Sequence, residues 1–360
     1  MEALIENTDT KQPTIVHELG TAYDFLMSLE VLHNPENFGL RASWAAGVRS
    51  RVPAGERSVL EDSLKLIYVP LSWLHALPEP RDADAVLWAL RQIPPVDRLA
   101  VVTKKSDTSS EYDEILAQVF ERRAWDEDDL EKMQKIFKGK KGYSLKDAQS
   151  VLDWWSKPEE FGELYLAALQ SYYQEFFAEE EQRIKPALQR AIEKSQSLAE
   201  EKNLPELIET LSQGVQLHID PEIREIIFVP SYWITPLILY AAINPEQMIL
   251  LYGARPADVS LVPGEGVPDA LLRILKALAD PTRLKTLRYL EQEPLSPAQL
   301  SRRLRLRAPT VVHHLEILRL ARLVRLNLEI PGERKYAARL EGLEDTFSSL
   351  KEFLHADQER

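Results

Sequence analysis

The carboxy-terminal part of the chain carries side chains that could contact DNA. If residues from about 308 onward are helical, apolar residues at spacings of four and three occupy one face of the helix: Val311, Leu315 and Leu318. The residues left facing outward near its start are Arg307, Ala308, Thr310 and His313, with Val312 beside them. Arginine can pair with guanine or grip a phosphate, threonine can bond a phosphate while its methyl group meets thymine, and histidine can donate in the major groove. This pattern predicts a DNA recognition helix.

Two capped helices should precede this helix and position it. Asp280-Pro281 has the form of an N-cap followed by proline at the first helical position, and Ser296 with Gln299 forms a capping box. A short turn at Arg305-Leu306 then leads into the recognition helix, which predicts a helix-turn-helix. Downstream, residues 324–329 and 334–338 look like two strands around Pro331-Gly332. We expect this hairpin, tipped by Glu333, Arg334 and Lys335, to be a wing whose cations touch phosphate.

Residues 275–336 resemble the ArsR family of winged-helix regulators. The resemblance rests on Leu-Ala-Asp-Pro-Thr-Arg (278–283), Pro-Thr-Val-Val-His-His-Leu (309–315) and Gly-Glu-Arg-Lys-Tyr (332–336). It implies a dimeric repressor and gives the recognition-helix role to Thr310, His313 and His314. Arg307 and Val312 depart from the family pattern, in which serine is usual at each position, and Arg322 replaces the usual glycine after the recognition helix. The residues expected at the DNA interface are therefore Ser296, Gln299, Arg305, Arg307, Ala308, Thr310, Val312, His313, His314, Arg334 and Lys335.

The distribution of charge supports double-stranded DNA as a partner. The chain of 360 residues has a net charge of −13, but residues 267–360 carry 17 Lys and Arg against 13 Asp and Glu, a net charge of +4. The remainder carries −17, so the acidic excess lies entirely upstream. A chain that meets phosphate through its carboxy-terminal unit fits this asymmetry.

The predicted fold is mainly α with a small antiparallel sheet. Helical spacing of apolar residues runs from Thr14 to about Gln216, and β-rich runs follow between Glu225 and Gly253. Pro and Gly residues between 254 and 266 predict a linker. We therefore expect a helical domain at 1–253, ending in the sheet, and a winged helix-turn-helix domain with a carboxy-terminal dimerisation helix at 267–360.

The final helix carries an apolar seam that favours a homodimer. Its residues alternate at spacings of three and four: Leu340, Leu343, Phe347, Leu350 and Leu354. Two recognition helices related by a twofold axis would read inverted half-sites. The alternative is that the seam only packs on the upstream domain.

The amino-terminal region has no motif that names its role. Aromatic residues such as Trp154, Trp155, Tyr172 and Phe176 could line a pocket for a small apolar or aromatic effector, although core packing is the simpler interpretation. Two alternatives stay open: an enzymatic domain, for which no convincing phosphate loop or nucleophile is found, and a protein-docking or architectural module whose winged helix binds DNA only weakly.

The composition also argues against several kinds of site. The chain has no cysteine, which excludes disulfides and thiolate sensing of arsenic-type metals. His355 and Glu359 lie one helical turn apart, but such an isolated terminal pair is usually solvated, so no metal or cofactor is predicted. The longest apolar run, residues 232–243, is too short to cross a bilayer. We find no secretory signal and expect a cytoplasmic, non-enzymatic protein that does not enter the membrane.

Overall fold

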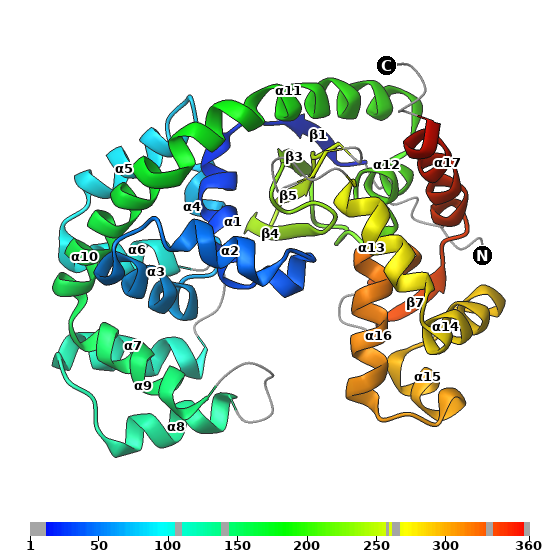
Figure 1. Cartoon of the computed structure of the whole chain (residues 1–360). Coiled ribbons are helices and arrows are strands. Elements are labelled where there is room, and N and C mark those ends of the chain that lie inside the picture. Colours follow the sequence, from blue (N-terminus) through cyan, green and yellow to red (C-terminus); the bar gives the residue numbers. More distant parts are fainter. Residues whose placement is uncertain are drawn as a thin grey trace, which may run out of the picture.

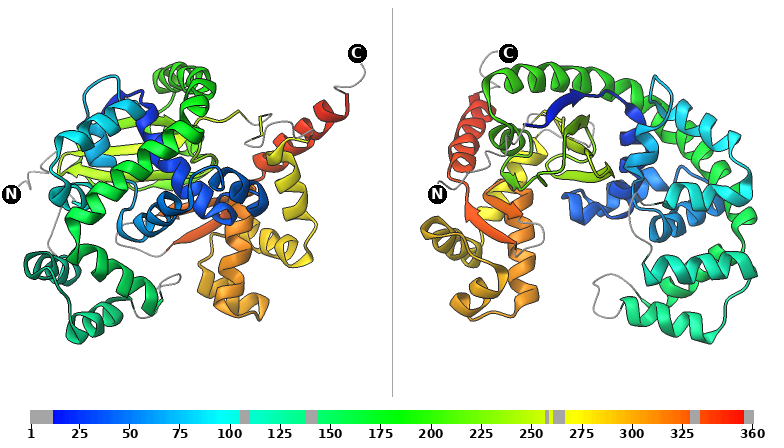
Figure 2. Two further views of the ribbon diagram at one scale, coloured as in Figure 1. Left: turned by 60° about the vertical axis from the view of Figure 1, so that its left-hand side comes forward. Right: turned by 180° about the vertical axis from the view of Figure 1, so that it is seen from behind.

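The computed structural model describes residues 12–104, 110–137, 144–256, 259–260, 267–328 and 334–355. In these residues helices predominate, accompanied by two small sheets (Figure 1). Helices α7–α9 and helices α14–α16 lie at opposite ends of the molecule, as the further views in Figure 2 also show. Within the described residues, no helix is both long and apolar enough to span a membrane.

The amino-terminal half is built mostly from helices. Their bounds are α1 Thr21–His33, η1 Pro35–Phe38, α2 Ala42–Arg49, α3 Ala54–Leu66, α4 Leu71–His75, α5 Ala83–Gln92, α6 Pro95–Thr103, α7 Glu111–Arg122, α8 Glu127–Phe137, α9 Leu145–Ser156, α10 Pro158–Tyr172, the π-helical segment η2 Tyr173–Phe177, α11 Ala178–Glu201 and α12 Leu204–Leu211. α10, η2 and α11 follow one another without a break, so residues 158–201 form one long helical segment. It runs up the left side and along the top of the view in Figure 1.

The core of this half explains most of its aromatic residues. Tyr165, Tyr172, Phe177 and Trp233 are all buried in one large apolar cluster. α1 lies at its centre and is buried on almost every side. The prediction of core packing therefore holds for these rings, whereas Trp73 and Trp155 also line a cavity described below.

Asp24 of helix α1 holds the end of strand β3 (Glu225–Ser231) and the two residues that follow it. Its carboxylate accepts hydrogen bonds from the Ser231 hydroxyl at 2.6 Å and from the backbone N–H groups of Tyr232 and Trp233 at 3.0 and 2.9 Å. Burial raises the pKa of Asp24 to about 6, although these donors oppose the rise.

The larger sheet corrects two expectations. It contains β1 Thr14–His17, β3 Glu225–Ser231, β4 Ile238–Asn244 and β5 Gln247–Gly253 in the order β1-β3-β5-β4. Only β4 and β5 pair antiparallel, whereas β1 and β5 both run parallel to β3, so the sheet is mixed and not antiparallel as predicted. Residues 14–17 were expected to begin a helix and instead form its edge strand.

Both faces of this sheet are covered. Along β3, Ile227 and Val229 join the large helical core, whereas Ile226 and Phe228 join a second cluster that contains residues of α12 and of strand β2 (Val215–Leu217). Strands buried on both faces read as continuous apolar runs, which matches the sequence of β3 and β5.

In the carboxy-terminal unit, the described residues form five helices and two strands. Their bounds are α13 Asp269–Leu278, α14 Pro281–Gln292, α15 Pro297–Leu304, α16 Ala308–Leu320, β6 Val324–Leu328, β7 Lys335–Ala338 and α17 Glu341–His355. β6 and β7 pair antiparallel, and β2 from the amino-terminal half pairs parallel with β6 as a third strand. The bond from Leu326 N–H to the Gly214 carbonyl is 2.8 Å long, so the two halves share one sheet.

The predicted linker at 254–266 is described only in part. Residues 257–258 and 261–266 lie outside the described residues. Arg255, within the predicted linker, is buried, and its guanidinium donates to the Thr235 carbonyl at 3.2 Å. The predicted boundaries at 253 and 267 stay predictions.

Candidate nucleic-acid interface

The Asp-Pro-Thr-Arg segment joins two helices through their ends. The Asp280 carboxylate caps α14 by accepting from the N–H groups of Thr282 and Arg283 at 2.8 and 2.9 Å. The Arg283 guanidinium donates to the Lys276 and Ala277 carbonyls, each at 2.8 Å. These are carbonyls of the last turn of α13, which has no intrahelical partners for them. Asp280 and Arg283 therefore fix the angle at which α13 meets α14.

Helix α15 begins with the predicted capping box. The Gln299 side chain accepts from Ser296 N–H at 2.8 Å, and the Ser296 hydroxyl accepts from Gln299 N–H at 3.4 Å. Ser296 was expected at the DNA interface, but it is fully buried and caps the helix. Gln299 is partly exposed.

A tight turn sets α16 against α15. Arg305 ends α15 in the left-handed conformation, with φ 56°, and the Ser301 hydroxyl donates to the Leu306 carbonyl at 2.5 Å. α16 begins at Ala308, with Arg307 as an N-cap residue that makes no side-chain cap. Because arginine stands where serine is usual, the N-cap side chain accepts no hydrogen bond from the N–H groups in the first turn of α16.

α16 divides into the two predicted faces. Val311, Leu315 and Leu318 are buried in the core of the winged helix. The side chains exposed around the start of the helix are Arg305, Arg307, Ala308, Thr310 and His313. Val312 is half-buried at the edge of this surface.

His314 lies partly inside the domain. Its Nδ1 is buried without a hydrogen-bond partner in the described part of the chain, and its ring lies 6.3 Å from that of His313. Burial lowers the pKa of His314 below its usual value, and the nearby Arg283 and His313 act in the same direction, against Asp280. This environment favours the neutral form of the His314 imidazole, which lies beside the exposed His313.

The wing has the predicted strands. Arg334 is exposed and Lys335 is partly exposed at the start of β7, whereas Pro331, Gly332 and Glu333 lie outside the described residues. The base of the wing is held to α15 by a short bridge in which Leu295 and Tyr336 exchange backbone hydrogen bonds of 2.8 and 2.9 Å.

The exposed residues from Arg305 to His313 and the cations of β7 thus lie on helices and a strand that share one small hydrophobic core. A comparison with protein-family models matches residues 280–325 to the family described as "Bacterial regulatory protein, arsR family". Residues 280–325 are an ArsR-family helix-turn-helix domain. The ArsR-family domain implies DNA-binding transcriptional regulation. Neither the curated proteins nor the solved structures contain a match to the chain.

The sequence-based residue set missed an exposed cation near the ArsR-family turn. Arg302 is exposed on α15, and within the described residues its side chain makes a long hydrogen bond of 3.4 Å to the Ala298 carbonyl. Its position on the second helix of the motif, three residues before the exposed Arg305, could have indicated it. Among the described residues, no three His, Asp or Glu side chains come together as metal ligands.

Proposed function

We propose that this chain is a sequence-specific transcriptional repressor that binds an inverted-repeat operator as a homodimer. The observation that carries the proposal is the division of α16, in which Val311, Leu315 and Leu318 are buried while Arg307, Thr310 and His313 stay exposed near its amino-terminal end. A recognition helix presents such residues to base edges in the major groove. Arg334 and Lys335 of the wing would contact backbone phosphate.

The exposed face of α17 supports a homodimer. Leu340, Phe347 and Leu354 are spaced by seven residues and are 51, 56 and 63% exposed. Leu343, from the predicted seam, instead packs on the winged-helix core. The three exposed residues form a stripe that the upstream half leaves uncovered, and a second copy could cover it.

Contacts between the halves support modulation of DNA binding by the amino-terminal region. Besides the β2–β6 pairing, the Arg319 guanidinium of α16 donates to the Ser212 carbonyl at 3.3 Å, and Arg325 of β6 pairs with Glu209 of α12 at 2.8 Å. A change in the amino-terminal half would therefore reach both the recognition helix and the wing. A large cavity in that half favours small-molecule sensing over protein docking. Such a regulator would act in the cytoplasm.

The test is DNA binding by the full chain and by a variant with Arg307, Thr310 and His313 changed to Ala. Both are titrated across a salt series with the protein's own promoter fragment and with a shuffled fragment of equal length. We expect the wild type to prefer the promoter and the triple variant to lose that preference, at a cost of about 1–3 kcal/mol per base contact. The salt slope should fall by about one unit if Arg307 grips a phosphate.

The matched control is Arg288→Ala, which removes one exposed cation from α14. It should retain the promoter preference. A triple variant that discriminates between the two fragments as well as the wild type would contradict direct reading by α16.

A further inference from the structure

A large cavity lies in the amino-terminal half, far along the chain from the DNA-facing residues. Its volume is about 1180 Å³, and its walls come from the α3–α4 connection, α6, α7, the end of α8, α9 and strand β4. Ligand sites for small organic molecules usually measure roughly 300–1,000 Å³. The hollow is therefore large enough for a molecule with several rings.

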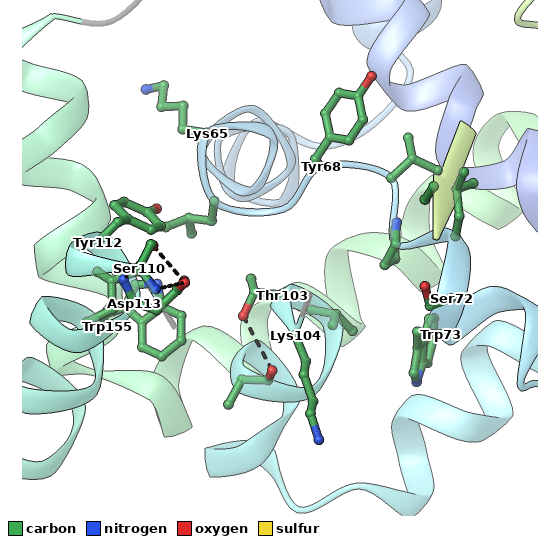
Figure 3. Close-up of a pocket in the computed structure, with 18 of the residues that line it drawn as sticks. Lys65, Tyr68, Ser72, Trp73, Thr103, Lys104, Ser110, Tyr112, Asp113 and Trp155 are labelled. Atoms are coloured by element: carbon green, nitrogen blue, oxygen red, sulfur yellow. Dashed lines mark hydrogen bonds between the residues drawn. The ribbon is translucent and has the colours of Figure 1, made fainter. Parts of the chain in front are cut away.

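Aromatic rings form much of the wall. They come from α4, α7, α8 and α9: Trp73, Tyr112, Phe120, Phe137 and Trp155. Figure 3 shows Trp73 on one side of the hollow and Tyr112 with Trp155 on the other, with Thr103 and Lys104 between them. Rings on opposing sides favour a flat apolar molecule over an extended polar one.

The charged groups of the wall do not favour an anion. Lys65 is already paired with Asp62 at 3.0 Å and with Asp147 at 3.4 Å, and Figure 3 shows its side chain pointing away from the hollow. This leaves Lys104, which is exposed, against three carboxylates: Glu111, Asp113 and Glu121. Residues outside 267–360 also carry a net charge of −17, so the surrounding field repels anions.

We propose that this cavity binds a lipophilic, ring-bearing small molecule that is uncharged or cationic, in contact with strand β4. The inference rests on the proposed sensing role of the amino-terminal half and gives that role a site and a ligand class. Leu239, Tyr240, Ala241 and Ala242 of β4 line the cavity, and the Ser72 hydroxyl of α4 donates to the Ala242 carbonyl at 3.3 Å.

Strand β4 gives the ligand a physical route to the DNA-binding unit. β4 pairs with β5, and β5 pairs with β3. On the far face, Phe228 and Leu250 pack in the cluster that contains Leu217 of β2 and reaches Leu328 of β6. A ligand that shifts β4 therefore moves a continuous packed unit that ends in the wing.

The experiment uses the full chain and a pair of fluorescent compounds with the same fused rings. N-phenyl-1-naphthylamine is uncharged, and 8-anilino-1-naphthalenesulfonate adds a sulfonate. We expect the uncharged compound to bind about tenfold more tightly than the sulfonate, a difference of about 1.4 kcal/mol. Hydrogen exchange of the amides of residues 239–242 should slow when the uncharged compound is bound.

Two variants separate this site from other apolar surfaces. Ala117→Trp places a large ring into the cavity from α7, where Ala117 is exposed, and Ala46→Trp adds the same ring at an exposed position of α2 outside the wall. Ala117→Trp should weaken binding of the uncharged compound about tenfold and abolish the slowed exchange, and Ala46→Trp should change neither. Equal binding by the two variants, a sulfonate compound that binds as tightly as the uncharged one, or unchanged exchange in β4 would each overturn the inference.

Promoter binding is measured on the same protein samples without either compound. Intact promoter binding with no uptake of N-phenyl-1-naphthylamine would overturn the cavity inference alone. Uptake at the cavity by a protein that does not distinguish its promoter would instead count against the proposed regulator and leave the ligand site standing.

Discussion

Arg322 places a large side chain on a left-handed stretch of backbone at the start of the wing. Its φ is 60°, a conformation that glycine adopts freely and that costs other residues about 1–2 kcal/mol. Its guanidinium is also largely buried among other arginines, including Arg273 and Arg255, and burial together with their charges lowers its pKa. The departure from the usual glycine, noted in the sequence, is therefore a site of stored strain.

Replacing Arg322 by glycine should stabilise the protein. We expect the free energy of unfolding at neutral pH to rise by at least about 1 kcal/mol, because the backbone strain and the buried cation are both removed. The burial penalty is full where the guanidinium is charged in both the folded and the unfolded state, so the gain should shrink as the pH rises through the lowered pKa of about 9. Denaturant unfolding at several pH values measures this change.

Arg305→Gly is the matched control, since Arg305 has φ 56° but an exposed side chain. It should gain only the backbone part, without the pH dependence. An Arg322→Gly protein that is less stable than the wild type would show that the guanidinium contacts outweigh the strain.

The buried and exposed faces of α16 could be predicted from the spacing of apolar residues alone, whereas the burial of single side chains on other helices could not. Val311, Leu315 and Leu318 are buried as predicted, because a regular helix fixes which residues share a face. Leu284 shares a helical spacing with Leu287 and Leu290 but is 49% exposed, while Thr286 is buried. Which side of α14 meets the core depends on how α13 and β7 pack on it, and no local pattern encodes that.

At the scale of elements, α17 offers the most direct structural support for self-association. Two charges introduced on its exposed stripe, Phe347→Glu with Leu354→Glu, should prevent dimerisation because they would be desolvated in the interface. Light scattering should then give the mass of one chain, 41.2 kDa, in place of twice that value. Operator affinity should fall about a hundredfold because the two half-sites are no longer held by one assembly.

Trp88→Glu makes a similar change at an apolar residue of α5 that is 52% exposed. It should leave both the mass and the operator affinity unchanged. A doubly substituted α17 that retains the mass of the wild type would place the interface elsewhere.

Capped helices were predicted well, whereas short strands that pair with distant segments were not. The start of α15 follows from Ser296 and Gln299, which satisfy each other's backbone groups locally. β1 and β2 have four and three residues, and each exists only because a distant strand pairs with it. The parallel pairing of β1 with β3 likewise depends on contacts between segments about two hundred residues apart, which periodicity does not contain.

At the scale of the whole molecule, the sheet β2-β6-β7 joins the amino-terminal half to the wing. Gly214, at the start of β2, has φ 109°, which only glycine adopts readily, and its carbonyl accepts the bond from Leu326 N–H. The turn after α12 is thereby bent so that β2 lies along β6. This geometry makes the two halves one mechanical unit.

Gln216→Pro should uncouple the halves. Proline at the centre of β2 removes a backbone donor from the three-residue strand, and Gln216→Val, at the same exposed position, keeps it. We expect scanning calorimetry to show one unfolding transition for the wild type and the Val variant, and two for the Pro variant. Two transitions already present in the wild type would contradict coupling through β2.

Two copies of α16 in one dimer should read symmetric half-sites. Hydroxyl-radical footprinting of the full chain on its own promoter tests this most directly. We expect two protected segments of inverted sequence whose centres lie about 10 base pairs apart, or a multiple of that spacing, on one face of the duplex. Protection of a single segment, or uniform protection that follows no sequence, would contradict it.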